Sequence, residues 1–296
     1  MPANVLAGAV APVLPVSMIS LMPGVTLCRL PAGAVRGGAA VELYHCLEGR
    51  LEVCSGDDCC YLTAGESLLC RAGAQAGGPL PVGTGVVLSL ADDAPLPATL
   101  LPELKGRTPA ALCLPLLEHG PCFLPADDGA APLLSSIASL AAAGEEAVCR
   151  LRLLELLLQL SSRDPAPRRS PPNRCPAIQA ALAKEVHRYL GDHLERHVTT
   201  AELSARFGAS QTSLKSCFRC VFGDSLFHSA RAMKMEAAAQ LLRESDRSVL
   251  DIAGSFGYDN AGKFAAAFRD VVGMTPSACR EAARSAACTA PEGAPV

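Results

Sequence analysis

Five polar residues recur between positions 211 and 219, at steps of one, three, one and three residues. They are Gln211, Thr212, Lys215, Ser216 and Arg219. On a helix this spacing places all five on one face. The groups are an amide, two hydroxyls, an ammonium and a guanidinium, which donate and accept hydrogen bonds but include no nucleophile paired with a base. The pattern therefore predicts recognition of a hydrogen-bonding surface, and no catalytic residue is assigned.

These residues lie within a pattern that occurs twice between residues 199 and 276. In each copy an aliphatic residue precedes a glycine by five positions, and an apolar residue precedes a phenylalanine by four. The residues are Leu203, Gly208, Leu214 and Phe218 in the first copy, and Ile252, Gly257, Phe264 and Phe268 in the second. A repeat of this kind indicates two copies of one supersecondary unit.

Each copy predicts a helix-turn-helix. A short helix, residues 200–207 or 249–256, ends at the glycine, which tolerates the left-handed conformation found at helix ends. A polar cap follows, Ser210 in the first copy and Asp259 or Asn260 in the second, and the next helix buries its i and i+4 pair. A long helix over residues 225–244 joins the copies. A second helix held in this way can lie in a DNA major groove.

The second copy has fewer polar groups on its exposed face, where Ala and Gly predominate. Only Asn260, Lys263 and Arg269 can form strong hydrogen bonds with DNA. We therefore predict that the first copy carries most of the base discrimination and that the second mainly positions the protein.

The 14 cysteines raise a second possible chemistry. Their irregular spacing, without a secretory n-region, favours free and mostly buried thiols in a reducing cytoplasm over a disulfide framework. A metal or redox site could be formed by His45, Cys46, Cys54, Cys59 and Cys60. That region has no CxxC pair and no His-x-His with a trailing acidic residue, so we favour a structural role and assign no metal. The one CxxC, Cys217 and Cys220, falls inside the predicted recognition helix, where packing is the preferred role.

Composition limits the other classes of function. The net charge is −3, but residues 177–284 carry 14 basic and 12 acidic side chains, whereas residues 1–162 carry 8 and 15. No phosphate-binding loop, nucleophile elbow or paired-carboxylate motif occurs, so no cofactor is expected. The apolar stretch 1–27 is interrupted by Pro12, Pro15 and Pro23, which argues against a signal peptide or membrane span and favours a cytoplasmic protein.

Short apolar runs separated by turn residues, followed by helical patterns, predict an α+β protein with two domains. Strands and turns over 25–95, with hairpins at 41–54 and 60–70, suggest a small β-barrel or sandwich, and helices follow over 96–162. The leucine-rich helix 145–160 is apolar on most sides, so its own domain or a second subunit must cover it. A Pro- and Arg-rich linker spans 163–176. An all-α domain occupies 177–285, and a disordered tail is predicted for 286–296.

The run from His187 to Arg280 resembles the DNA-binding domain of the AraC/XylS transcription regulators. The matching residues are Ala201-Glu202-Leu203, Ser210, Leu214, Phe218, Lys234, Ala238, Leu241, Leu242, Ile252-Ala253, Gly257, Tyr258, Phe264, Phe268, Arg269, Gly273, Thr275, Pro276 and Arg280. The resemblance implies seven helices and two helix-turn-helix units, set by a rigid joining helix in successive major-groove segments. Thr212, Lys215 and Ser216 match base-contacting positions, and Arg219 is assigned to a phosphate. The front half is similar in texture to the cupin-like sensing domain often fused to this module.

Two functions stay open. The first is a bacterial transcription regulator controlled by an unidentified small-molecule effector, with promoter DNA and RNA polymerase as partners and a homodimer formed through the leucine-rich helix. The second is an enzyme fused to the DNA-binding module, such as a DNA-repair alkyl transferase with a Cys nucleophile. Cys59 and Cys60 beside Tyr61 offer no visible base or zinc set for that chemistry. The effector, the operator and the choice between activator and repressor are not specified by the sequence.

Overall fold

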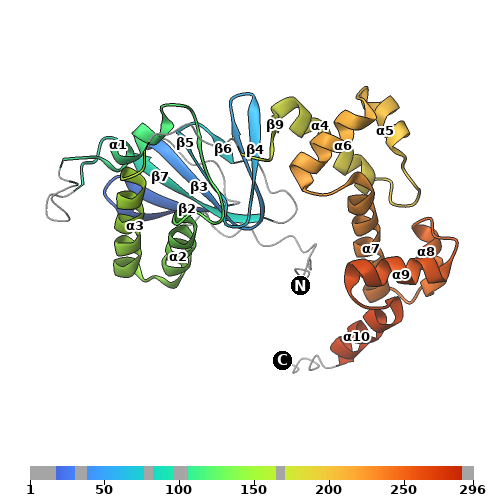
Figure 1. Cartoon of the computed structure of the whole chain (residues 1–296). Helices are drawn as coiled ribbons and strands as arrows, with labels where there is room; N and C mark the ends of the chain where they lie inside the picture. The colour runs from blue at the N-terminus through green and yellow to red at the C-terminus, as the bar shows by residue number, and fades with distance from the viewer. Residues whose placement is uncertain are drawn as a thin grey trace, which may run out of the picture. The chain divides into compact units, whose positions relative to one another are not determined.

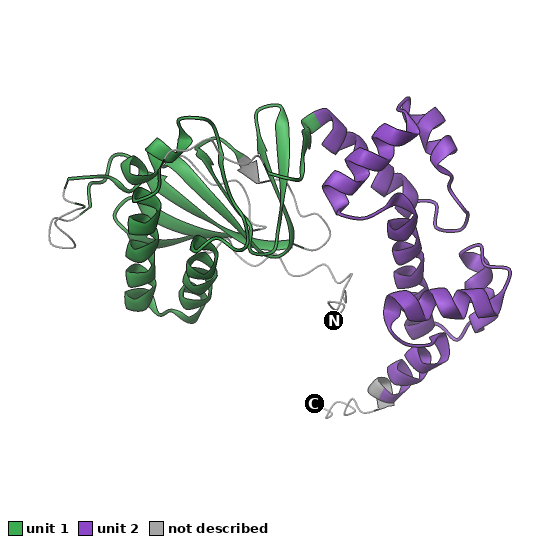
Figure 2. Ribbon diagram, in the orientation of Figure 1, with its two compact units in different colours: residues 1–177 green, residues 178–296 purple. Residues whose placement is uncertain are grey.

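The computed structural model describes residues 18–30, 39–76, 83–96, 104, 106–164 and 171–288. The chain forms two compact units, residues 1–177 and residues 178–296 (Figures 1 and 2). The first unit is mixed α and β, and the second is helical. In the described part of the chain, the helices all fall short of the length and apolarity that crossing a membrane requires.

The first unit is built on antiparallel strands. The strands are β1 (Met18–Met22), β2 (Val25–Leu30), β3 (Ala39–Ser55), β4 (Asp58–Thr63), β5 (Ser67–Arg71), β6 (Gln75–Ala76), β7 (Gly83–Ala91), β8 (Cys122–Leu124) and β9 (Arg174–Pro176). The main path runs β1-β2-β7-β3-β4-β9, while β5 and β6 also pair with β3 and β8 pairs with β5. β1 and β9 end this path unpaired with each other, so the described strands form an open sheet and not the predicted closed barrel.

The long strand β3 joins the two parts of the sheet. Its first part pairs with β5 and β7, and its last part, from Arg50, pairs with β4. The register shifts between Cys46 and Glu48, as at a β-bulge, which bends a strand and increases its local twist. The same shift exchanges the faces of the strand, because side chains alternate with a period of two.

Each face of the sheet has its own apolar core. Val41 and Leu43 of β3 belong to a first core, which is completed by α1 (Pro109–Cys113), the 3-10 helix η2 (Leu114–Leu117), α2 (Ala130–Ala143) and α3 (Glu146–Ser161). Figure 1 shows α2 and α3 side by side against the sheet. Tyr44 and Cys46 point the other way, into a second core with Leu68 and Val87.

The leucine-rich helix α3 is only partly covered by its own unit. Its buried side chains are Cys149, Leu153, Leu156, Leu157 and Leu160. Leu151 is 65% exposed, and Leu154 and Leu158, which follow it at helical steps, are partly buried. One side of α3 that carries leucines is therefore not covered within the first unit.

The second unit contains seven helices in the described residues. They are α4 (Ala177–Gly191), α5 (Thr200–Phe207), α6 (Gln211–Phe222), α7 (Leu226–Glu244), α8 (Val249–Ser255), α9 (Ala261–Val272) and α10 (Pro276–Cys288). Two ends differ from the sequence expectation. Residues 174–176 of the expected linker form β9, and α10 continues to Cys288, inside the expected tail. The linker residues 165–170 and the tail residues 289–296 lie outside the described part.

Candidate nucleic-acid interface

The first helix-turn-helix unit consists of α5 and α6. Gly208 ends α5 with a φ of +63°, and the Ser210 hydroxyl accepts a hydrogen bond from the Ser213 amide at 3.1 Å to cap α6. Leu203, Leu214 and Phe218 are at most 1% exposed. They pack together in a cluster with residues of α4 and α7. This core fixes how far α6 is rotated about its own axis.

That rotation places the predicted recognition residues in solvent. Leu214, Cys217, Phe218 and Val221 form the buried stripe of α6. Gln211, Thr212, Lys215, Ser216 and Arg219 are all exposed. The structure therefore brings all five onto one accessible face. Cys217 packs in the buried stripe, and burial raises the pKa of its thiol.

The second helix-turn-helix unit consists of α8 and α9. Phe264, Ala267 and Phe268 are buried, whereas Lys263 and Arg269 are exposed. Asn260, rather than Asp259, caps α9, because its side-chain oxygen accepts from the Lys263 amide at 3.0 Å. The cap uses the Asn260 oxygen and leaves its amide NH₂ as the group available to a partner. This face thus carries fewer polar groups than α6.

A partly exposed hydrogen-bonding network fixes the turn that leads into the first helix-turn-helix unit. Glu202 of α5 accepts from Arg196 at 2.6 Å and from the Tyr189 hydroxyl at 3.0 Å. The hydrogen bond from Arg196 is the main cause that lowers the pKa of Glu202 to about 2. The charged pair therefore ties the connection after α4 to the first turn of α5.

A lysine on α7, the helix that joins the two helix-turn-helix units, forms hydrogen bonds to both sides. Lys234 Nζ donates to the Arg196 carbonyl at 2.9 Å and to the Phe256 carbonyl at 3.0 Å. Arg196 precedes the first helix-turn-helix unit, and Phe256 lies at the end of α8 in the second helix-turn-helix unit. Partial burial lowers the pKa of Lys234 from its ordinary value.

A close backbone approach reinforces this connection. Gly257, with a φ of +76°, lies so near the loop before α5 that a Cβ there would be 3.0 Å from the Glu195 carbonyl oxygen. The equivalent Gly208 has open space around it. Sequence reasoning missed both Lys234 and this contact. The available signal was the presence of Lys234 among the residues that match the AraC/XylS pattern.

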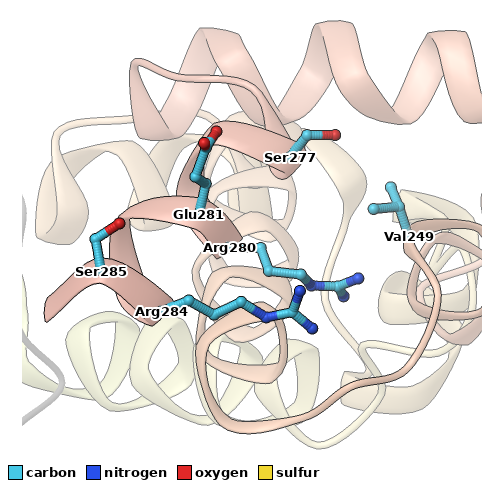
Figure 3. A pocket seen from close by; sticks show the side chains of 6 residues that line it. All are labelled: Val249, Ser277, Arg280, Glu281, Arg284 and Ser285. Carbon is cyan, nitrogen blue, oxygen red and sulfur yellow. The ribbon is translucent and has the colours of Figure 1, made fainter. Parts of the chain in front are cut away.

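Figure 3 shows a hollow between α8 and α10, lined by Val249, Ser277, Arg280, Glu281, Arg284 and Ser285. Its two arginines also hold α10 to the connection between α7 and α8. Arg280 donates to the Arg247 carbonyl, and Arg284 pairs with Asp246 at 2.7 Å. We therefore assign Arg280 and Arg284 to the packing of the helical unit, residues 178–296, and not to DNA contacts.

The His and Cys residues of the first unit are not gathered at one site. His45 is fully buried on the first-core side, with Nδ1 2.9 Å from Ser67 Oγ and Nε2 2.9 Å from Ser135 Oγ. Cys46 and Cys60 belong to the second core. Cys54 and Cys59 form a disulfide, so the expectation of free thiols is wrong for this pair. They are directly opposed across the β3–β4 hairpin, which the sequence spacing alone did not reveal.

Comparison with known proteins identifies the helical unit. A family model described as a helix-turn-helix domain matches residues 203–282. The MmsAB operon regulatory protein of Pseudomonas aeruginosa is 31% identical over 99 residues, which are 33% of this chain and 32% of that protein. Transcriptional regulator Rob of Salmonella typhimurium is 28% identical over 102 residues, or 34% and 35% of the two chains.

Among solved structures, the DNA-binding domain of AdpA in complex with a target DNA is 27% identical, with a TM-score of 0.35. The match covers 36% of this chain and 97% of that one. The chain spans about a third of the length of the curated relatives it matches. From the family model and the two regulators, residues 203–282 belong to the AraC-type helix-turn-helix domains.

Proposed function

We propose that the protein is a sequence-specific transcription regulator of the AraC type that binds promoter DNA through α6 and α9. The observation that carries this proposal is the exposure of all five polar residues of α6 opposite its buried stripe. Lys215 would donate to the acceptor atoms of guanine, with Thr212 and Ser216 beside it, and Arg219 would contact a phosphate. Lys263 and Arg269 of α9 would mainly contact the backbone.

The test compares the two lysines that occupy equivalent helices. Lys215→Ala should cost about 1–3 kcal/mol of binding free energy and relax the preference at one base pair. Lys263→Ala should weaken binding to all duplexes similarly. It should also reduce the slope of log affinity against log salt concentration by about 1, because one phosphate contact is lost. Selection from a random duplex pool, followed by titration at several salt concentrations, measures both effects.

Two results would count against these assignments. If Lys263→Ala or Arg269→Ala relaxed base preference while Lys215→Ala did not, the roles of the two helix-turn-helix units would be reversed. If the wild-type protein had no salt-sensitive preference for any duplex, with or without cell extract, the proposed function itself would fail.

We further propose that the first unit, the cupin-like half of the chain, binds the effector on its second-core face. Glu42 is 4% exposed there and accepts from the Tyr44 hydroxyl at 3.0 Å, and burial raises the pKa of its carboxyl group. Ser89 is paired with Glu42 across β3 and β7, so it points to the same side. Its hydroxyl is buried without a hydrogen-bond partner among the described residues. Such a polar group suits a ligand that carries a hydrogen-bond donor.

Glu42→Gln tests this location. DNA affinity of the wild-type protein should change when the small-molecule fraction of a cell extract is added, and the variant should respond less. An equal response of both proteins would place the effector elsewhere.

The exposed side of α3 supports a homodimer. Leu151 is 65% exposed and Val148 41%, and Leu154 and Leu158 continue the same side at helical steps. Light scattering at working concentration should give a dimer mass for the wild-type protein and a monomer mass for Leu151→Glu. A monomeric wild-type protein would remove the proposal. RNA polymerase is proposed as the partner of the DNA-bound form.

The alternative of an alkyl transferase gains no support. An activated nucleophile needs a lowered thiol pKa. Of the two cysteines named for that chemistry, Cys59 is held in the disulfide with Cys54, and Cys60 is buried in the second core.

A further inference from the structure

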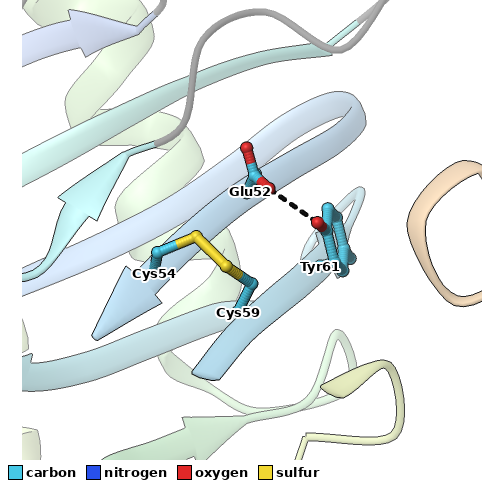
Figure 4. Close-up of a disulfide and its surroundings, with 4 residues drawn as sticks. All are labelled: Glu52, Cys54, Cys59 and Tyr61. Carbon is cyan, nitrogen blue, oxygen red and sulfur yellow. Dashed lines mark hydrogen bonds between the residues drawn. A yellow bond between two sulfur atoms is a disulfide. The ribbon is translucent and has the colours of Figure 1, made fainter. Parts of the chain in front are cut away.

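Three cysteines occupy one row across neighbouring strands of the first unit. Cys54 of β3 is opposite Cys59 of β4, and Cys59 is opposite Cys175 of β9. Directly opposed residues of antiparallel strands point to the same face of a sheet. Cys54 and Cys59 form the disulfide drawn in Figure 4, and Cys175 carries a thiol. The middle residue, Cys59, therefore has a sulfur-bearing neighbour on each side.

The backbone already brings Cys59 and Cys175 within disulfide reach. Flanking hydrogen bonds run from the Tyr61 amide to the Asn173 carbonyl at 2.8 Å and from the Ala177 amide to the Asp57 carbonyl at 2.7 Å. These pairs lie two residues to either side of the Cys59–Cys175 pair, so that pair is of the same hydrogen-bonded type. Opposed Cα atoms of this type are about 5.5 Å apart. A disulfide spans about 4.4–6.8 Å between Cα atoms.

Burial selects which thiol can reach the middle sulfur. Cys59 is 2% exposed and Cys175 5%, whereas Cys54 at the edge of the row is half-buried. A thiol in solution thus meets Cys54 first, and the group already beside Cys59 is Cys175. Cys60 follows Cys59 in sequence, but its side chain belongs to the second core on the other face.

We propose that Cys54, Cys59 and Cys175 form a thiol–disulfide exchange site with two alternative disulfides that share Cys59. The Cys175 thiolate attacks Cys59 Sγ, so that the Cys59–Cys175 bond forms and the Cys54–Cys59 bond breaks. Cys54 leaves as a thiolate and takes up the proton that Cys175 lost. One disulfide is consumed and one is made, so the step needs no oxidant or reductant. A row of three sulfurs places the attacking and leaving atoms on opposite sides of the middle one.

A carboxylate lies beside the disulfide of the row. Glu52 lies on the same face, with an oxygen within 4.8 Å of the Cys54 and Cys59 sulfurs. It accepts a hydrogen bond from the Tyr61 hydroxyl at 2.6 Å (Figure 4). One of its oxygens is therefore close to Cys54 Sγ, the atom that takes up the proton in the exchange.

The exchange would move the cross-link to the end of the first unit. The present disulfide joins residues five apart in sequence, whereas a Cys59–Cys175 bond would join residues 175 − 59 = 116 apart. It would fix β9, whose last residue immediately precedes α4. A regulatory meaning rests on the proposed function, because disulfides in a reducing cytoplasm are usually transient and redox-sensing or catalytic. The exchange itself does not depend on DNA binding.

Disulfide mapping of the full-length chain in glutathione buffers of graded oxidation tests the site. Samples are quenched in acid, alkylated under denaturing conditions and digested with trypsin. A Cys54–Cys59 bond then lies inside the peptide 51–71, whereas a Cys59–Cys175 bond joins that peptide to the peptide 175–184. A second cleavage at Asp57 and Asp58 separates Cys54 from the fragment that holds Cys59, Cys60 and Cys70, and fragmentation of that peptide in the mass spectrometer identifies the sulfur involved.

Both species are expected in the wild-type protein. Cys54→Ser should form only the joined peptides, and Cys175→Ser only the internal bond. Cys60→Ser is the matched control and should behave as the wild-type protein does. If Cys54→Ser and the wild-type protein gave no joined peptides in buffers where Cys175→Ser forms its internal bond, the row would hold one static disulfide. A joined species that disappears in Cys60→Ser, or no disulfide in any variant, would also overturn the proposal. The wild-type result decides if Cys54→Ser does not fold.

Discussion

Replacement of Lys234 by Met should loosen the connection between the two helix-turn-helix units. Met is unbranched and of similar length but has no donor, so the Arg196 and Phe256 carbonyls lose their shared partner. Hydrogen bonds to a charged group contribute about 1.5–3 kcal/mol each. Desolvation of the ammonium group, which lowers the pKa of Lys234, offsets part of this contribution. We expect a net loss of about 2 kcal/mol in the free energy of unfolding of the helical unit.

The assay has a stability arm and a DNA arm. Urea unfolding followed by the helical circular dichroism signal measures the first, with Lys215→Met as the control, because Lys215 is exposed on α6. The second compares affinity for a complete operator with affinity for one cut to the half bound by α6. Lys234→Met should reduce the advantage of the complete operator, because α9 is no longer held in phase. If Lys234→Met matched the control in stability and kept the full advantage, the connecting role would be refuted.

Two further predictions concern the buried His45 and the close backbone approach at Gly257. Burial lowers the pKa of His45 to about 4, so as the pH falls the unfolded chain binds the proton first. Stability of the first unit should therefore fall between about pH 6.5 and 4, by about 2 kcal/mol at pH 5, and His45→Gln should flatten that dependence in urea titrations. Gly257→Ala should lower the melting temperature more than Gly208→Ala. Both glycines have positive φ, but only at Gly257 would a Cβ meet a backbone oxygen, that of Glu195. Equal shifts in the two variants would contradict this account.

The helical unit was predictable because its helices are specified by residues close together in the sequence. The five-residue and four-residue intervals fix where a helix ends and which face of the next one is buried, and α5 begins and ends at the predicted residues. The solvent face of α6 follows from the same periodicity. The role of Lys234 was not predictable in this way. Its partners, Arg196 and Phe256, lie 38 and 22 residues away, and both contribute main-chain carbonyls that no side-chain pattern marks.

The sheet shows the same limit more strongly. Alternating residues predicted strands here, but the predicted hairpin over 41–54 is wrong, because residues 39–55 form the single strand β3. The strands on either side of the predicted turn at 63–66, β4 and β5, both pair with β3 and not with each other. Pairing, like closure of a sheet, depends on which distant strands meet, which is a long-range property. The disulfide depends on the register that sets Cys54 opposite Cys59. β9 pairs with β4 over a sequence separation of more than a hundred residues, and its Pro-flanked sequence reads locally as a linker.

The unequal polarity of the two recognition helices gives the connection between them a functional reason. α6 can hold its site through five exposed polar residues, whereas α9 offers two cations and the free end of a capping Asn260. A helix with few contacts adds to affinity only if ordering it on DNA costs little, because association must first offset lost freedom of motion. Lys234 and the close approach at Gly257 limit that freedom before DNA is met. Because α9 has few polar groups, it depends on being held rigidly to the rest of the helical unit. Variants at Lys234 or Gly257 should therefore reduce the affinity for DNA by more than the removal of the α9 contacts alone.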